Sequence, residues 1–570
     1  MPDSSPKARF IADSRLVEES LPGGGVVWRN SIALPDQRPD IFDRLVGWAA
    51  TVPDRPLLTE PSANGRRSLT YGETLAGARK LRRVLEQAHG LCKGDAVASL
   101  VPAGIDALLL KLACLAGGFV HIALPPFPFR DGGDNEAAQS LLEALPPKLL
   151  VAPQGHVAVD TLSAISIADL LAANAEGLDG DIPHAPHDWA AVFFTSGSTG
   201  APKGVPITRG MISSNQAAIA ALWPFLTEAP PVLVDWLPWH HVFGGLDNIF
   251  KIIWNGGTMH VDAAPGPKTM AASIALMQEV EPTLHIGVPL GLRLLLDRLE
   301  TDGEAAQAFT KKLRAIFFAG AGIDAELWRR LAEFRDAQGT FEILSGYGAT
   351  EAASTICLSP APLERPGELG HPLPGHRIRL AEMDGRTELR VAGPNIAPCY
   401  LIGGKRVALP VDEDGFYRTG DAAILRSRAD GIPVFAFDGR LAEDFKLSSG
   451  VKVRTGPLRA GLLAQCAPLA DDIVVAGENC ERLVALVFPS RQSADTVDLL
   501  EKLAERIGEW NAANSSSSTR IARFDVASEP ADRAQGELSD KGQIVQSRYL
   551  RNHQRRFEAL QAGEGHAPTR

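Results

Sequence analysis

Apolar residues follow two different spacings along most of the chain. Some segments place an apolar residue every three or four positions, which is typical of a helix with one buried face. Others are short and almost continuously apolar, which is typical of a buried strand. Helical spacing occurs at 79–87, 107–115 and 211–222, and strand-like runs occur at 96–101, 190–194, 232–237 and 315–319. Such alternation with short connections predicts βαβ units and a mostly parallel sheet.

The pattern changes after about residue 440, where the apolar runs become shorter. Short strands are predicted at 472–476 and 483–488, followed by a long helix at about 495–513. The polar, Ser-rich tract at 514–519 is interpreted as a surface loop. The expected fold class is therefore α/β, with a large N-terminal α/β body and a small C-terminal α+β domain.

The most apolar stretch, 104–126, contains Asp106 and Lys111 and is divided by Gly117 and Gly118. Internal charges and a central glycine break do not suit a membrane span, which needs about 20 predominantly apolar residues. We interpret the stretch as a buried helix followed by a buried strand, and we expect no membrane-spanning segment.

Size and composition narrow the class of protein. A chain of 570 residues is too long for one hydrophobic core, so two or more domains are expected. Its net charge of −11 argues against a nucleic-acid partner, because phosphate backbones are bound by basic surfaces. The six cysteines form no Cys-x-x-Cys pair, and the N-terminal segment has no apolar core of a secretory signal. We predict a reducing, cytoplasmic location, and either a monomer or a homodimer fits the sequence.

The most specific local pattern is Thr-Ser-Gly-Ser-Thr-Gly-Ala-Pro-Lys-Gly at 195–204, directly after a strand-like run. Glycines let the backbone turn tightly and direct N–H groups at an anion, while hydroxyl groups and a lysine add donors and positive charge. The lysine is followed by glycine instead of Ser or Thr, so the segment is not a Walker A motif. The predicted phosphate-binding residues are Thr195, Ser196, Gly197, Ser198, Thr199, Gly200 and Lys203.

This segment resembles the phosphate loop of the acyl-adenylate-forming superfamily, which includes acyl-CoA synthetases, non-ribosomal adenylation domains and firefly luciferases. Four further segments resemble signatures of that family and follow its order: 237–245, 346–351, 417–421 and 438–444. The resemblance implies the adenylate-forming enzyme fold. Its large multi-layer α/β body would span 1–439, its hinge 440–443, and its small mobile C-terminal α+β domain 444–570.

The resemblance also implies a set of nucleotide contacts. Adenylation brings together two anions, a carboxylate and the α-phosphate of ATP, so fixed positive charges and donors are required. Glu351 would hold Mg²⁺, Thr350 would donate to the α-phosphate, and Tyr347 would offer its ring to adenine. Asp421 would accept both ribose hydroxyls, and Arg440 would donate to the same sugar. Backbone groups of Gly320, Ala321 and Gly322 would approach the other side of adenine.

Two more residues complete the implied catalytic set. His241, in the Leu-Pro-x-x-His spacing of 237–241, matches the family histidine that borders the acyl pocket, whereas His240 is incidental. Adjacent histidines on a strand would point to opposite faces, so no metal site is expected there. Lys541 matches the family lysine that bridges the substrate carboxylate and the α-phosphate. Its surroundings read Ser-Asp-Lys-Gly instead of the common Ser-Gly-Lys.

Longer strings resemble feruloyl-CoA synthetases, namely 28–30, 48–56, 237–245, 437–450 and 536–542. They imply ferulate or a related hydroxycinnamate or aryl acid as substrate. Trp236, Trp239 and Phe243 would line the acyl pocket beside His241, although aromatic residues fit a plain core equally well.

The same resemblance implies coenzyme A as the acceptor of the acyl group. The small residues Ser448, Ser449 and Gly450, with Lys446, suit a narrow tunnel for its pantetheine arm and suit an ordinary strand-end turn equally well. Two positions depart from the family pattern: Ala442 replaces the usual Asp or Lys of the hinge, and Cys399 replaces a glycine before Tyr400. Whether Ala442 alters the domain rotation is left open.

The sequence therefore predicts an AMP-forming acid–CoA ligase that uses ATP and Mg²⁺. Two other ligases fit the same motifs: an acyl-AMP ligase that loads a separate carrier protein, and a fatty-acyl-CoA synthetase. A nucleotide-binding regulator without catalytic activity is the alternative outside the enzymes. The presence of Lys203, Glu351, Asp421, Arg440 and Lys541 argues against that regulator.

Overall fold

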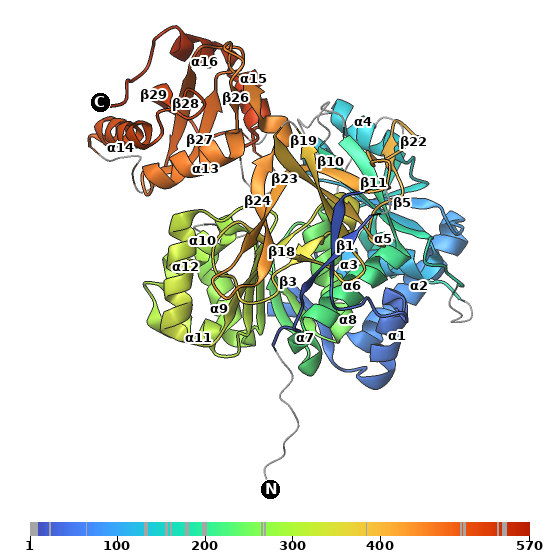
Figure 1. Cartoon of the computed structure of the whole chain (residues 1–570). Coiled ribbons are helices and arrows are strands. Elements are labelled where there is room, and N and C mark those ends of the chain that lie inside the picture. Colours follow the sequence, from blue (N-terminus) through green and yellow to red (C-terminus); the bar gives the residue numbers. More distant parts are fainter. Residues whose placement is uncertain are drawn as a thin grey trace.

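The computed structural model in Figure 1 describes residues 10–569 except for short internal gaps. These gaps are 22–23, 64, 130–134, 154–157, 160–161, 177–181, 197–201, 264–265, 267–268, 384, 491–492, 494–496, 533–534 and 539–543. The predicted phosphate-loop residues Gly197, Ser198, Thr199 and Gly200 and the predicted catalytic Lys541 lie outside the described residues. Ser196 is described only by its backbone.

The first large sheet contains nine of the described strands. Their order is β22 (Lys405–Val407), β21 (Tyr400–Ile402), β11 (Pro202–Thr208), β10 (Trp189–Ser196), β6 (Val120–Ala123), β5 (Ala96–Ser99), β7 (Leu149–Ala152), β9 (Leu162–Ser166) and β8 (Ala158–Val159). The neighbours from β10 to β9 are parallel, as the alternation of strands and helices predicts. β11, β21 and β22 extend this parallel core with antiparallel pairs.

The second large sheet contains fifteen of the described strands. Their order is β1 (Leu16–Ser20), β2 (Val26–Asn30), β19 (Arg377–Met383), β20 (Arg386–Ala392), β23 (Tyr417–Ser427), β24 (Pro433–Arg440), β18 (Glu368–Pro372), β17 (Cys357–Leu358), β16 (Glu342–Tyr347), β15 (Ala315–Ala319), β14 (Leu284–Gly287), β12 (Val232–Asp235), β13 (Thr258–Val261), β3 (Pro56–Ser62) and β4 (Gly65–Thr70). Only the neighbours from β16 to β3 are parallel. The prediction of a mostly parallel sheet is therefore wrong for the other half, where hairpins join the strands and no helical crossover is available.

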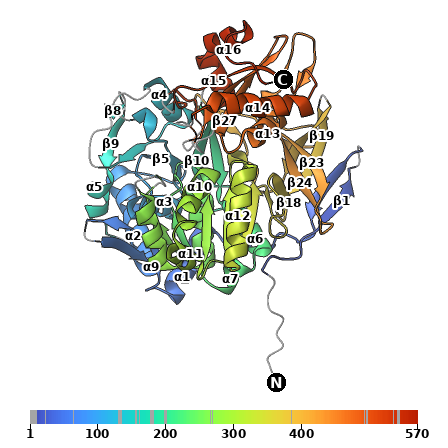
Figure 2. The same ribbon diagram turned by 90° about the vertical axis from the view of Figure 1, so that its left-hand side faces the viewer.

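Helices separate and cover the two sheets. The helices of the body are α1 (Ile41–Thr51), α2 (Tyr71–His89), α3 (Ile105–Gly117), α4 (Asn135–Ala144), α5 (Ile167–Ala172), α6 (Arg209–Leu222), α7 (Phe225–Glu228), α8 (Ile249–Asn255), α9 (Met270–Val280), α10 (Pro289–Leu299), α11 (Gly303–Thr310) and α12 (Ala325–Gln338). One core contains buried residues of α1, α2, α3, α6 and α8 together with residues of both sheets. A second core packs α9–α12 on the outer face of the fifteen-stranded sheet, and a third packs α4 on the nine-stranded sheet. The multi-layer α/β body expected from the sequence is confirmed (Figure 2).

Local sequence explains where these helices begin and end. Thr70 and Glu73 form a capping box at the start of α2, and Gly90 ends the helix in the left-handed conformation at φ 62°. The apolar stretch at 104–126 folds as the buried helix α3 and then the buried strand β6, as predicted. Gly118, at φ 65°, ends α3 and lets the chain reverse into the sheet.

The C-terminal region forms a smaller α/β unit, which lies above the body in Figure 1 and Figure 2. Its sheet has the order β27 (Ala470–Ala476), β28 (Leu483–Pro489) and β29 (Ile521–Val526). Alternate residues of β27 face opposite cores, because side chains point to opposite faces of a strand. One core includes α13 (Thr455–Cys466) and α14 (Leu499–Ala513), and the other includes α15 (Gln546–Asn552) and α16 (Gln554–Gln561). The exact domain boundaries stay a prediction.

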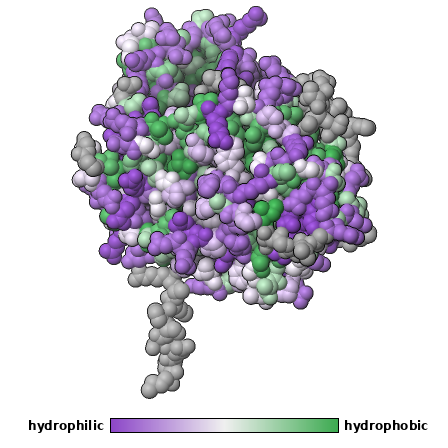
Figure 3. Space-filling model, turned by 90° about the vertical axis from the view of Figure 1, so that its right-hand side faces the viewer, coloured by the Kyte–Doolittle hydropathy of each residue, from purple (hydrophilic) through white to green (hydrophobic). Residues whose placement is uncertain are grey.

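The exterior is mostly polar on the face seen in Figure 3, where hydrophobic residues form small groups separated by hydrophilic ones. Within the described ranges, none of the helices combines the length and the apolar character needed to span a bilayer.

Candidate active site

The predicted phosphate loop joins two antiparallel strands of the nine-stranded sheet. β10 and β11 pair so that Thr195 lies opposite Lys203 and Ser196 lies opposite Pro202. Gly204 follows Lys203 where the next strand, β21, comes close. A β-carbon at Gly204 would lie 3.2 Å from the side chains of Leu401 and Val192. The buried strand predicted before the loop is confirmed as β10, which extends through Thr195 and Ser196, and β11 begins at Pro202 and includes Lys203 and Gly204.

The predicted metal carboxylate lies in a tight turn after β16. A β-carbon at Gly348 would lie 1.5 Å from the Ser354 carbonyl oxygen, so only glycine fits there. The turn continues into the short helix η3 (Thr350–Ala352), in which Glu351 is buried with 8% of its surface exposed. Its carbonyl oxygen accepts a hydrogen bond from Ala397 N at 2.7 Å, which fixes the backbone. Thr350 begins the helix and is half-buried.

Asp421 lies on β23, and its carboxylate contacts residues of two other strands. Oδ2 accepts a hydrogen bond from the Tyr347 hydroxyl at 2.7 Å, and Oδ1 lies 3.3 Å from Arg440 Nε on the paired strand β24. Burial and the neighbouring carboxylate raise the pKa of Tyr347 well above its usual value. The Asp421 carboxylate likewise raises the pKa of Arg440. Three residues that sequence reasoning assigned to adenosine thus lie together.

Two tyrosines that sequence reasoning missed connect this region to the phosphate loop. The Tyr400 hydroxyl donates to Glu351 Oε1 at 2.7 Å and lies 3.2 Å from the Tyr417 hydroxyl. The Lys203 ammonium lies 5.1 Å from the Tyr400 ring centroid. Burial raises the pKa of both tyrosines above the usual value, and the Glu351 carboxylate raises them further. The sequence shows Tyr400 next to Cys399, but no local pattern indicates that its hydroxyl contacts Glu351.

The adenine-side glycines follow β15. Gly320, Ala321 and Gly322 lie just beyond its carboxyl end, beside β16, where Ala319 pairs with Gly346. Gly320 has φ 82°, a conformation that favours glycine, and both glycines are exposed. The segment is therefore adjacent to the strand that carries Tyr347.

The residues proposed for the acyl pocket divide into core and partly exposed positions. Trp239 is buried at 6% exposure and its indole N–H donates to Asp235 at 3.3 Å, so it is a core residue. Trp236 and Phe243 are partly exposed, and Phe243 contacts the Phe317 ring edge-on at 6.0 Å.

The strand interpretation of the adjacent histidines is wrong. His240 and His241 lie in a turn before the π-helix at Phe243–Asn248, with ring centroids 4.3 Å apart. The turn forms because Gly245 lets the chain fold back on itself. A β-carbon there would lie 1.9 Å from the Trp239 carbonyl oxygen.

Buried polar groups hold this segment in place. The Asp235 carboxylate accepts from Asn248 Nδ2 at 2.8 Å, and burial raises its pKa to about 6. Next to it, Asp247 and Lys251 form an ion pair at 2.6 Å, with side-chain exposures of 2% and 1%. Gln216 and Asn215 donate to the same aspartate. Residues remote in sequence therefore orient the turn that carries His241.

The predicted hinge lies between two carboxylates bound to one arginine. Arg386, whose side chain is 1% exposed, pairs with Asp438 at 3.2 Å before the hinge and with Asp444 after it. Ala442, in the short helix η4 (Leu441–Glu443), is exposed. Lys446 and the exposed turn Ser448–Gly450 belong to the hairpin of β25 (Phe445–Lys446) and β26 (Lys452–Val453).

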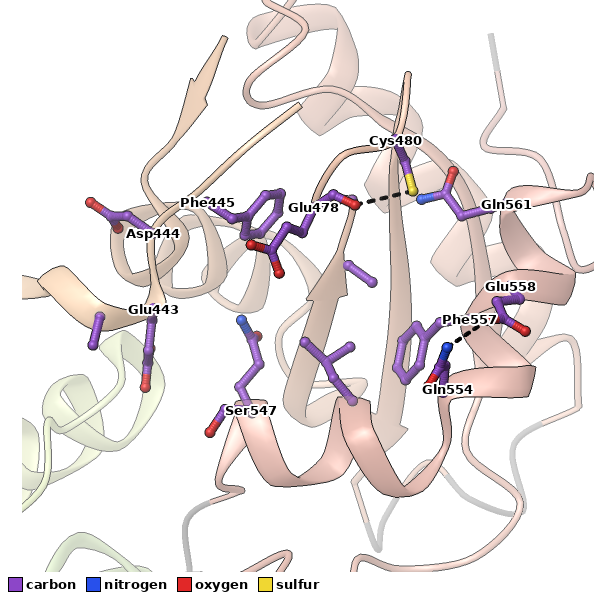
Figure 4. A pocket seen from close by; sticks show the side chains of 15 residues that line it. Glu443, Asp444, Phe445, Glu478, Cys480, Ser547, Gln554, Phe557, Glu558 and Gln561 are labelled. Atoms are coloured by element: carbon purple, nitrogen blue, oxygen red, sulfur yellow. Dashed lines mark hydrogen bonds between the residues drawn. The ribbon is translucent and has the colours of Figure 1, made fainter. Parts of the chain in front are cut away.

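A cavity of about 590 Å³ lies in the C-terminal unit, where Ala442 and Glu443 of the predicted hinge form part of its lining. Figure 4 shows Glu443, Glu478 and Glu558 around it, together with Phe445 and Phe557. Neither Lys446 nor the turn at 448–450 lines this cavity. Because its lining is acidic, the cavity is unsuited to a ligand that carries phosphates.

The residues that the sequence predicts to bind a nucleotide thus come from both large sheets of a multi-layer α/β body. The chain belongs to the AMP-binding enzyme family, whose model matches residues 45–401. The model of the AMP-binding enzyme C-terminal domain matches residues 443–564.

Several known proteins resemble the chain. The isonitrile lipopeptide synthase of Streptomyces coeruleorubidus is 30% identical over 74% of this chain and 28% of its own length. The p-hydroxybenzoic acid–AMP ligase FadD22 of Mycobacterium tuberculosis is 26% identical over 75% of this chain and 59% of its own length. The chain thus spans less than two thirds of either relative. The feruloyl-CoA synthase of an Amycolatopsis species is 28% identical over 68% of this chain and 77% of its own length.

Among solved structures, the o-succinylbenzoate coenzyme A synthetase of Bacillus subtilis, in complex with AMP, has a TM-score of 0.71 at 20% identity. The match covers 90% of this chain and 98% of that one. The adenylate-forming enzyme fold predicted from the motifs is confirmed.

Proposed function

We propose that the protein activates a carboxylic acid with ATP and transfers the acyl group to coenzyme A. In the first half-reaction, a carboxylate oxygen bonds to the α-phosphorus while the bond to pyrophosphate breaks. In the second, the thiol sulfur bonds to the acyl carbon, the bond to AMP breaks, and the thiol proton leaves. The observation that carries the proposal is that Lys203 and Glu351 both contact Tyr400, while Asp421 accepts a hydrogen bond from Tyr347, four residues before Glu351.

The donor set of Glu351 fits a magnesium ion that arrives with ATP. In the part of the chain that the structure describes, no group of three or more His, Cys, Asp or Glu side chains is arranged for a metal. A lone carboxylate beside a phosphate loop is typical of Mg²⁺, which binds one or two carboxylates and takes its other ligands from phosphates and water. When bound, the ion would neutralise phosphate charge. Glu351 would hold it and Lys203 would add a fixed positive charge.

The adenosine would contact residues on both halves of the fifteen-stranded sheet. Asp421 would accept hydrogen bonds from the ribose hydroxyls, because a carboxylate oxygen can accept more than one hydrogen bond. Arg440 is two-thirds exposed and is free to donate to the same sugar. Tyr347 would contact adenine with its ring, opposite the backbone at 320–322, and Thr350 would donate to the α-phosphate.

Lys541 and His241 complete the proposed mechanism. Lys541 would neutralise the α-phosphate and the incoming carboxylate during adenylation, and His241 would border the acyl group. Rotation about the hinge at 440–443 would then exchange Lys541 for coenzyme A at the same carbonyl. Lys446 and Ser448–Gly450 would border its pantetheine arm.

The proposed acid is ferulate or a related hydroxycinnamate or aryl acid. Support comes from the five strings that resemble feruloyl-CoA synthetases and from the feruloyl-CoA synthase relative. The partly exposed rings of Trp236 and Phe243 suit a flat aryl group. The p-hydroxybenzoic acid–AMP ligase relative favours a second candidate, an aryl-AMP ligase whose acceptor is a carrier protein.

Two assays on the full chain test these proposals. Pyrophosphate exchange with ferulate, p-coumarate, benzoate and octanoate measures adenylation and its acid specificity. Consumption of free coenzyme A with the best acid then separates the two acceptors. We expect exchange with the hydroxycinnamates and thioester formation. Absence of exchange with every acid would contradict the ligase function, and a kcat/KM highest for octanoate would contradict the aryl acid alone.

A further inference from the structure

Tyr400, the first residue of β21, contacts two groups that the proposed function uses. Its hydroxyl donates to Glu351 Oε1 at 2.7 Å, and its ring faces the Lys203 ammonium, 5.1 Å from the centroid. We infer that Tyr400 is a positioning residue that fixes both the magnesium carboxylate and the phosphate-binding lysine. The inference rests on the function proposed for those two residues and assigns the protein a further residue on which use of Mg·ATP depends.

The hydrogen bond determines how the Glu351 carboxylate is presented. The last torsion of a glutamate side chain has broad minima, so a free carboxylate rotates easily. The Tyr400 hydroxyl occupies Oε1 on a residue that is already buried, whereas Oε2 accepts no hydrogen bond from any described residue. One oxygen is therefore anchored by the phenol and the other is left for a cation.

The Glu351 carboxylate determines how the hydroxyl groups of Tyr400 and Tyr417 are oriented. A tyrosine hydroxyl has one proton, and Tyr400 must give it to Glu351, because an ionised carboxylate only accepts. The Tyr417 hydroxyl, 3.2 Å away, therefore donates to the Tyr400 oxygen. The chain from Tyr417 to Tyr400 to Glu351 is fully oriented and buried, and hydrogen bonds in such chains strengthen one another.

The ring of Tyr400 holds the lysine through the strand pairing. β11 and β21 pair antiparallel with Gly204 opposite Leu401, so Lys203 and Tyr400 lie diagonally across this pair, within reach of a long lysine side chain. An ammonium within about 6 Å of a ring centroid is attracted to the ring face. The hydroxyl of Tyr400 thus contacts Glu351 and its ring contacts Lys203, so the two contacts can be removed by different substitutions.

Two variants of Tyr400 test the inference by calorimetric binding of ATP without any acid, so that no turnover occurs. Tyr400→Phe keeps the ring and removes the hydroxyl. We expect it to weaken Mg·ATP binding about 10- to 150-fold, the range for losing a hydrogen bond to a charged group. Binding of metal-free ATP should change less than about twofold, because the ring still holds Lys203. Tyr400→Leu should weaken metal-free ATP as well, by about threefold.

Tyr71→Phe is the matched control. Tyr71 is a fully buried tyrosine whose hydroxyl donates to the Gly257 carbonyl oxygen at 2.9 Å, away from the nucleotide residues. This variant should lose stability without changing the ratio of Mg·ATP to ATP affinity. If Tyr400→Phe leaves the ratio of Mg·ATP affinity to ATP affinity unchanged, either because neither affinity changes or because both fall equally, the positioning role is wrong. Failure of the wild-type protein to bind ATP at all would instead overturn the proposed function.

Discussion

Replacement of Asp421 by asparagine tests the proposed ribose site directly. The carboxylate is enclosed, with 11% of the side chain exposed, between the Tyr347 hydroxyl at 2.7 Å and Arg440 Nε at 3.3 Å. Asparagine keeps the size of the side chain but offers one acceptor oxygen and places an N–H₂ group where the other oxygen was. One of the two proposed ribose hydrogen bonds is therefore lost, and the other is no longer assisted by charge.

The expected loss of affinity follows from the strength of these bonds. A hydrogen bond to a charged group contributes about 1.5–3 kcal/mol. Losing one and weakening the other amounts to about 2–4 kcal/mol, which corresponds to a Kd for ATP raised about 30- to 800-fold. The pair with Arg440 adds little to this figure, because Arg440 is 66% exposed and water screens the interaction.

A cycle of protein and nucleotide variants isolates the contact with ribose. Calorimetric Kd values would be measured for ATP, 2′-deoxyATP and 3′-deoxyATP with the wild-type protein and with Asp421→Asn. We expect the wild-type protein to lose about tenfold or more for each missing hydroxyl, and the variant to lose less than about threefold. Asp430→Asn, an exposed position in the same hairpin, is the control for removal of a charge. If Asp421→Asn still discriminated against the deoxy nucleotides as strongly as the wild-type protein, the ribose assignment would be wrong.

Three further predictions concern other parts of the molecule. Lys541→Ala should slow adenylation by about two to four orders of magnitude, as for a lost charge stabiliser. It should still convert supplied acyl-adenylate and coenzyme A to thioester at nearly the normal rate, and equal losses in separately measured half-reactions would argue for a structural role. Asp444→Ala leaves the buried Arg386 with one partner fewer and should cost about 3 kcal/mol in urea unfolding, against less than about 1 kcal/mol for the exposed Asp414→Ala. Burial lowers the pKa of His285 to about 4, below its unfolded value of about 6.5, so its contribution to stability is complete above pH 6.5 and is lost as the pH falls towards 4. His285→Gln should therefore flatten the curve of unfolding free energy against pH between these two values. An unchanged slope would contradict this prediction.

Local sequence was sufficient to predict the helices and strands that carry the site. It was not sufficient to predict which residues, far apart in the sequence, contact one another. The strand before the phosphate loop and the buried helix α3 followed from apolar spacing, because burial of a segment depends on its own residues. The bond from Tyr400 to Glu351 joins residues 49 positions apart, and the order of strands in two sheets determines it. Periodicity contains no information about such partners. The histidine turn was misread for a related reason, since Gly245 allows a fold-back that apolar spacing does not reveal.

The two tyrosine hydrogen bonds lie where separately built parts of the body meet. Tyr347 on β16 ends the parallel half of the fifteen-stranded sheet, and its bond reaches Asp421 on β23, beyond β17, β18 and β24 in the strand order. Tyr400 belongs to the nine-stranded sheet, and its bond to Glu351 reaches the turn that follows β16. Neither sheet alone contains both the lysine proposed to bind phosphate and the carboxylate proposed to bind magnesium. The separation of Lys203 from Glu351 therefore depends on how the sheets pack, and the ring and hydroxyl of Tyr400 fix that separation before any nucleotide binds. A site preorganised in this way needs little rearrangement when ATP arrives, because its charged groups are already held in position.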